Sequence, residues 1–354
     1  MNLLQNQISP VVTLRKPPNP FPTFDVNWAS HFYSSDKGNH IYILAREALV
    51  KYDLDQQIIT EKYEYPTDYG DPYGALNPHT HLIYVIFTYC MWTVFDLKKK
   101  AWDVSYNYDD DDLMPTPIVN FKFIPSPINQ LHCMQHNNHY RINDDINSDN
   151  RLFKLSSDIG LEQNHPSAGK SVYNEQQFQI MMFQEGVDYI LMADLHGLLD
   201  EKQNECNWRK SKLKLKHVLP NRARNFEIIL WNEILFVFNL EKKFIECIDL
   251  NHPQNGSFIN HINEDFKFEL VIKDNNANIH LLQLSETHDV KKNQSYHHKV
   301  SLFDLVPLNI MKVNQKDWET LVIGHCRNCE KNNKLPFIPY YLKQLILKFF
   351  PIFV

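Results

Sequence analysis

The segment "LHCMQHNNHYR" gathers residue types that bind transition metals. His132, Cys133, His136 and His139 are all zinc-ligand types, and a structural zinc ion takes four such ligands in a tetrahedron. If the segment is a β-strand, however, His132 and Cys133 point to opposite faces. The chain has 17 histidines, so clusters also arise by chance. We therefore predict no metal and no cofactor, and expect these residues in a surface loop or at a strand edge.

Two further motifs lack the context that their chemistry needs. Cys326 and Cys329 form a single C-x-x-C pair, whereas structural zinc needs a second pair and a thioredoxin-like site needs a βαβ unit. "AGKS" at 168–171 resembles the end of a phosphate loop, but Asn164 stands where that loop needs glycine. No Ser-His-Asp or Cys-His arrangement can be assembled from spacing, because such groups meet only in space. These motifs therefore identify no catalytic residue.

Charged segments indicate which class of partner the chain could bind. A net charge of -6 over 354 residues argues against a general attraction to nucleic acid. "YDDDDLMP" (108–115) lacks the ligand spacing and glycine of a calcium loop, so it is a solvated acidic loop or a docking point for a basic partner. "WRKSKLKLKH" (208–217) has a run of alternate lysines, which predicts an edge strand with one basic face. Phosphate binding there is an alternative that lacks interleaved aromatic residues.

The composition predicts a soluble globular protein. Hydrophobic residues make up 43% of the chain and aromatic residues 13%, which is enough for a sizeable core. The 6 cysteines are scattered through a chain too long to need disulfide staples, which fits a reducing compartment. No basic segment followed by a long apolar run is visible near the first residues, and no stretch supplies about 18 uninterrupted apolar residues. We therefore expect a cytoplasmic protein without a membrane span.

One short unit recurs along the chain and indicates how the candidate residues are positioned. A hydrophobic residue followed by Asp-Leu comes after β-like runs, at steps of about 40 to 60 residues, with Phe153-Lys154-Leu155 as a degenerate copy. Most copies follow a second run rich in β-branched and aromatic residues, such as "HIYIL" and "EILFVFN". A strand period of this length is typical of a β-propeller, and a pair of β-sandwiches is the alternative. We expect an all-β propeller over residues 1–312, of about six four-stranded blades, with a seventh if residues 10–33 supply one.

The best copy of the unit, "TVFDLKKKAWDV", resembles the second half of a kelch repeat. Its strand ends in Phe95-Asp96, and Trp102 follows six positions after the aspartate. The kelch family has a β-propeller fold, although the Gly-Gly pair of that family is absent here. We expect Trp102 to pack against a neighbouring blade and the repeated aspartates to bond backbone amides of their turns. These aspartates are Asp53, Asp96, Asp194, Asp249 and Asp304.

The pattern changes after Leu308. "KDWETLVIGHCRNCEKNNK" and "PYYLKQLILKFF" place apolar residues at helical spacing, which predicts a short α-helical extension over residues 313–354. "IPYYLKQLILKFFP" also resembles the opening helix of an F-box. The alternative is a helix that packs on the propeller. This extension is a candidate site for a second partner.

The sequence favours a non-catalytic scaffold or adaptor that binds a protein partner through propeller loops. The alternative is a hydrolase or oxidoreductase with its site in the central channel. The segments 65–73, 106–113 and 296–299 combine aromatic, charged and histidine residues. Within them or beside them, the candidate binding residues are Tyr69, Tyr73, Tyr106, Tyr108, Asp110, Asp111, His297 and His298.

Overall fold

The computed structural model describes most of the chain between residues 30 and 305. The described residues are 30–34, 40–45, 48–56, 58–66, 72–77, 79–87, 91–103, 106–107, 118–125, 127–135, 137–142, 152–156, 158–160, 169–199, 205–222, 225–262, 270–274, 277–283 and 296–305.

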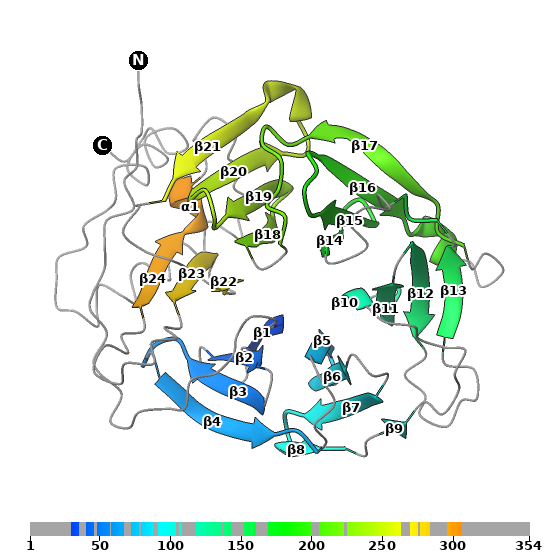
Figure 1. Cartoon of the computed structure of the whole chain (residues 1–354), viewed down its shortest axis with the longest axis vertical. Coiled ribbons are helices and arrows are strands. Elements are labelled where there is room, and N and C mark those ends of the chain that lie inside the picture. The colour runs from blue at the N-terminus through cyan, green and yellow to red at the C-terminus, as the bar shows by residue number, and fades with distance from the viewer. Residues whose placement is uncertain are drawn as a thin grey trace, which may run out of the picture.

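Six antiparallel sheets surround a central axis, and each sheet is one blade (Figure 1). Blade 1 contains β1 (Ser30–Ser34), β2 (His40–Leu44), β3 (Ala48–Asp53) and β4 (Ile58–Glu64). Blade 2 contains β5 (Pro72–Asn77), β6 (Leu82–Phe87), β7 (Met91–Asp96) and β8 (Ala101–Trp102), and β9 (Tyr106–Asn107) also pairs with β7. Blade 3 contains β10 (Ile118–Ile124), β11 (Gln130–Gln135), β12 (Asn138–Ile142) and β13 (Leu152–Ser156).

The remaining blades follow the same order from the axis outward. Blade 4 contains β14 (Gly169–Asn174), β15 (Gln179–Gln184), β16 (Tyr189–Asp194) and β17 (Trp208–Lys214). Blade 5 contains β18 (Phe226–Trp231), β19 (Ile234–Asn239), β20 (Phe244–Asp249) and β21 (Ser257–His261). Blade 6 has three described strands, β22 (Leu270–Lys273), β23 (Asn278–Gln283) and β24 (Tyr296–Ser301), which precede the short helix α1 (Leu302–Leu305). The predicted all-β, six-bladed propeller is confirmed.

Burial of the second strands on both faces explains why they appear in the sequence as apolar runs. All six residues of β19 are buried, because both faces of the strand are covered by neighbouring blades. A strand that is buried on both faces reads as a continuous apolar run instead of an alternating one. The other second strands, β2, β6, β11, β15 and β23, also coincide with runs seen in the sequence.

The hydrophobic core is divided among the blade interfaces. Each pair of neighbouring blades shares one cluster of buried side chains in the described part of the chain. Ile41 and Ile43 of blade 1 pack with Leu270 and Ile272 of blade 6, so side-chain packing closes the ring. Burial of apolar area contributes roughly 25 cal/mol per Å2, so these interfaces supply most of the stability of the ring.

Two copies of the repeated unit lie elsewhere than the pattern predicted. Phe153-Lys154-Leu155 belongs to β13, the outermost strand of blade 3, and does not end a third strand. Phe303-Asp304-Leu305 lies in α1, after β24 has ended. The extension expected at 313–354 lies outside the described residues. Among the described helices, none has the length and apolar character required to span a bilayer.

Candidate functional site

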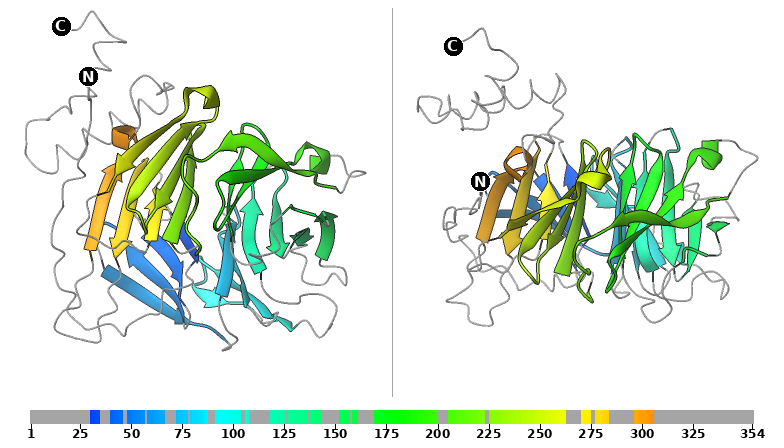
Figure 2. Two further views of the ribbon diagram at one scale, coloured as in Figure 1. Left: turned by 45° about the horizontal axis from the view of Figure 1, so that its top comes forward. Right: turned by 90° about the horizontal axis from the view of Figure 1, so that it is seen from above.

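The antiparallel order of the strands gives the ring two distinct faces. Asn120 lies beside Gly169, and Lys122 beside Ser171, so the inner strands β10 and β14 run in the same direction. The turns after first and third strands therefore emerge on one face, which we call the turn face. Figure 2 shows α1 (orange) and the 3-10 helix η1 (His196–Leu199, green) along this face. The chain enters first strands and leaves fourth strands on the opposite face, which we call the connection face.

The described residues of the three nominated segments lie toward the connection face. Tyr73 lies near the start of the inner strand β5, and Tyr106 lies in β9 at the outer end of blade 2. His297 and His298 lie at the start of β24. Tyr73 is half-buried against the cluster between blades 2 and 3. The candidates Tyr69, Tyr108, Asp110 and Asp111 lie outside the described residues.

On the turn face, four repeated aspartates hold the turns that follow third strands. Each carboxylate accepts the backbone N–H of the residue two positions later, at distances of 2.8 to 2.9 Å. Burial tends to raise the pKa of Asp96, but the backbone N–H groups of Lys99 and Lys98 lower it below its ordinary value. Asp304 lies in α1. The four aspartates that cap turns are Asp53, Asp96, Asp194 and Asp249.

Trp102 occupies the outer contact between blades 1 and 2. It pairs with Phe95 across β7 and β8, and the two ring centroids are 4.9 Å apart. Tyr65, which follows the outer strand of blade 1, lies 5.3 Å from Trp102 between ring centroids. Aromatic pairs in tilted or edge-to-face geometry stabilise such contacts.

A polar network joins the inner strands of blades 3, 4 and 5. The Lys122 ammonium donates to the Ser171 carbonyl oxygen at 2.8 Å, and the Ser171 hydroxyl donates to Asn120 Oδ1 at 3.0 Å. Lys170 forms an ion pair with Glu227. Burial lowers the pKa of Lys122 to about 8, and the nearby Glu227 carboxylate partly opposes this shift. These groups satisfy one another across the blade interfaces, as buried polar groups require.

A second clamp joins blades 4 and 5 at the turn face. Glu233 is buried, and its Oε2 accepts hydrogen bonds from Asn174 Nδ2 at 2.8 Å and Gln177 Nε2 at 3.0 Å. Neither this clamp nor the inner network was foreseen from the sequence. The partners lie 49 to 59 residues apart, close to one repeat, and this periodicity is the signal that could have indicated them.

The two histidines considered as metal ligands form a buried pair. His132 and His139 are both 0% exposed, and their Nδ1 and Nε2 atoms lie 2.9 Å apart. The expected surface position was wrong, because these side chains lie inside the interface between blades 3 and 4. Cys133 instead packs in the cluster between blades 2 and 3, on the opposite face of β11. Within the described residues, no group of three or more His, Cys, Asp or Glu side chains is arranged to hold a metal ion.

The hydrogen-bond pattern assigns a proton arrangement to the histidine pair. Trp208 of β17 can only donate, and its Nε1–H lies 3.3 Å from His139 Nδ1. His139 therefore carries its proton on Nε2 and donates it to His132 Nδ1. Burial lowers the pKa of His139 to about 3. Burial also lowers the pKa of His132 well below its ordinary value, and the nearby His139 and Arg141 add to the effect.

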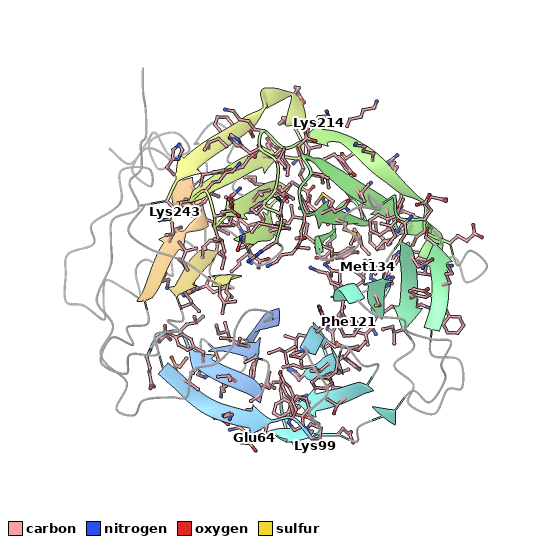
Figure 3. The ribbon with its side chains drawn as sticks, in the orientation of Figure 1. Glu64, Lys99, Phe121, Met134, Lys214 and Lys243 are labelled. Carbon is pink, nitrogen blue, oxygen red and sulfur yellow. The ribbon has the colours of Figure 1, made fainter. Side chains whose placement is uncertain are left out.

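The predicted basic edge strand is present as β17, the outermost strand of blade 4. Lys210, Lys212 and Lys214 are exposed, whereas Ser211 and Leu213 between them are half-buried. Figure 3 shows Lys214 at the outer rim of the ring.

The remaining motifs occupy other positions. Lys170 and Ser171 of "AGKS" lie in the inner strand β14, in a strand and not in a loop before a helix. Cys326 and Cys329 lie outside the described residues.

Comparison with known proteins yields distant similarities of structure. No protein-family model matches the sequence, and no curated protein matches it. A virginiamycin B lyase from Staphylococcus aureus is 12% identical with a TM-score of 0.46, over 77% of this chain and 85% of that chain. The Pan2 WD40 domain from Neurospora crassa is 10% identical with a TM-score of 0.46, over 76% of this chain and 73% of that chain. Similarities this distant carry no inference about activity or partners.

Proposed function

We propose that this chain is a non-catalytic scaffold that recognises a protein partner through the connection face. The observation that supports the proposal is that Tyr73, Tyr106 and the pair His297 and His298, which are far apart in the sequence, lie at strand ends toward one face of the ring. Loops held by a rigid framework are the usual place for recognition. In this proposal the protein is cytoplasmic and its ring is a divergent relative of kelch propellers.

The inner strands favour a scaffold over an enzyme. A channel enzyme would need several acidic or histidine side chains within reach of one substrate. In the sequences of the six inner strands, Glu227 is the one acidic residue and His31 is the one histidine, and the Glu227 carboxylate is already paired with Lys170. A carboxylate neutralised in this way is poorly placed to act as a general base.

The position of α1 supports an adaptor with two separate contact regions. Leu302 and Leu305 of α1 are buried in the cluster between blades 5 and 6, and α1 lies along the turn face. In the proposal, the residues after 305 bind a second component, and the first partner binds on the opposite face. The two partners then do not compete for the same surface.

Affinity capture from the native cells tests the proposal with three versions of the chain. A variant of the connection face, Tyr106→Ser with His297→Ser and His298→Ser, should lose its main partner, and a chain ending at Leu308 should keep it. The matched control changes three exposed residues of the turn face, Lys98, Glu175 and Asn251, to serine. If the control and connection-face variants capture the same proteins as the unchanged chain, the connection face is not the recognition surface.

A further inference from the structure

The lysine row of blade 4, which we define as Lys210, Lys212 and Lys214, lies on one side of the outermost strand. Lys210 pairs with Leu191, and Lys214 pairs with Tyr189 on the neighbouring strand β16. Both partners belong to the cluster between blades 3 and 4, so the row follows the outer opening of that blade interface. Successive lysines are two residues apart in the sequence, and the pairing of the strand with β16 is irregular between Lys210 and Lys214.

The charges of this row are not neutralised within the described part of the molecule. Other lysines have acidic partners there: Lys51 lies 3.0 Å from Glu61, and Lys99 lies 3.3 Å from Asp96. None of the three lysines of the row lies within the 4.0 Å of a described carboxylate that defines an ion pair. Lys210 instead rests over the Tyr189 ring, with its Nζ 3.4 Å from the ring centroid. The row therefore concentrates positive charge on a protein whose net charge is -6.

We propose that the lysine row binds an extended acidic segment of a partner protein. Alternate side chains of an extended peptide lie on one side of it, so alternate acidic residues of such a segment can face the row of lysines. An acidic residue at these positions supplies a carboxylate where no described residue of the chain supplies one. The row lies on blade 4, whereas the described candidate residues Tyr73, Tyr106, His297 and His298 lie on blades 2 and 6, and the inference does not depend on the function proposed above.

The surroundings favour a peptide over a nucleic acid. Proteins that bind single strands place aromatic rings where bases can stack. Here, Tyr189 is buried beneath Lys210, and Trp208 is half-buried while its indole N–H donates to His139. Both neighbouring rings are thus engaged in the structure. The net negative charge of the chain also disfavours a polyanion that extends beyond the row.

The backbone of β17 favours docking through side chains over addition of a new strand. The pairing of β16 and β17 is irregular between Tyr189 and Leu191, which places a bulge within the row. The Leu213 N–H donates to Ser211 Oγ at 3.0 Å, so this edge amide already has a partner. Bulges and lysines are also common means of preventing strands from adding to an edge. Binding should therefore be electrostatic, moderate in strength and sensitive to salt.

Fluorescence anisotropy with the full chain tests the inference. The probe is a labelled dodecapeptide in which Glu and Ser alternate one by one. The comparison peptide has the same composition, but its Glu and Ser residues alternate in pairs. The probe should bind more tightly than the comparison peptide, and salt should weaken it. Lys210→Gln with Lys212→Gln and Lys214→Gln should weaken binding about tenfold, because three exposed ion pairs are lost. The corresponding Lys→Arg variant should retain binding.

The matched control carries the same loss of charge at scattered exposed lysines, Lys62, Lys98 and Lys242, and should bind the peptide like the unchanged chain. Circular dichroism melting establishes that every variant is folded, and single Lys212→Gln replaces the triple variant if the latter does not fold. Equal weakening in the control and the row variants would overturn the inference, because net charge alone would explain binding. Tighter, row-dependent binding of an oligonucleotide or of anionic vesicles would also overturn it. Neither result would contradict the proposal that the connection face binds a protein partner.

Discussion

Replacing His139 by glutamine is expected to remove acid sensitivity from the interface between blades 3 and 4. Glutamine can accept the Trp208 N–H with its amide oxygen and donate its amide N–H to His132, so it can reproduce both hydrogen bonds of the imidazole. Unlike histidine, it does not titrate. The variant therefore separates the effect of proton binding from the effect of a missing side chain.

The pKa values give the direction and size of the effect. The pKa of His139 is about 3 in the folded chain, and about 6.5 is ordinary for an exposed histidine. Between these values the unfolded chain binds a proton that the folded chain does not, so stability is present above about pH 6.5 and declines as the pH falls. The slope is about 1.4 kcal/mol per pH unit, which amounts to about 2 kcal/mol between pH 7 and pH 5 for this one group.

Urea unfolding of the unchanged chain and of His139→Gln at pH 7 and pH 5 measures this difference. The unchanged chain should lose about 2 kcal/mol more unfolding free energy than the variant over this interval. This range lies above the titration of aspartates with lowered pKa values, such as Asp96 and Asp274. The control is His79→Gln, which removes an exposed histidine instead of a buried one. Parallel pH profiles for the unchanged chain and His139→Gln would refute the reasoning.

Three further substitutions test the contacts that hold the turns and blades. Asp96→Ala removes the acceptor of two turn amides and should lower the free energy of unfolding, measured in urea, by about 1 to 3 kcal/mol. The free energy of unfolding of Asp96→Asn should be closer to that of the unchanged chain. Glu233→Ala leaves the buried Asn174 amide without its acceptor, so the free energy of unfolding should fall by about 2 kcal/mol in the same assay, more than for Glu233→Gln. Equal losses for the two variants would contradict the clamp. Because the pKa of Lys122 is lowered to about 8, the unfolded chain keeps this proton to higher pH, so stability should rise with pH. Relative to Lys122→Met, the unchanged chain should gain about 2 kcal/mol of unfolding free energy from pH 8 to pH 10. If the difference between the two chains is the same at both pH values, the Lys122 ammonium is not poorly solvated.

Local patterns were sufficient to predict the ring and the basic edge. The second strands are covered on both faces, so their burial appears in the sequence as continuous apolar runs such as "ILFVFN". Asp96 and its equivalents cap amides only two or three residues away, so this interaction is visible in one short segment. The alternate lysines of β17 likewise reflect the exposure of a single strand.

Contacts between blades could not be predicted in this way, because their partners are about one repeat apart in the sequence. Lys122 and Ser171 are 49 residues apart, and Asn174 and Glu233 are 59 residues apart, yet each pair is in direct contact. The same limit explains the error over Phe153, since whether a strand is third or fourth in its blade depends on which strands pair with it.

The sequence by itself determined the strand content, the repeat and the capped turns, because these depend on hydrophobic pattern and on bonds between near neighbours. Only the tertiary structure decided that His132 and His139 are buried and bonded to each other, since the blade that covers them begins about thirty residues later in the chain. It also decided which strand ends lie on the same face of the ring, because this depends on the direction in which the strands of each blade run relative to the axis.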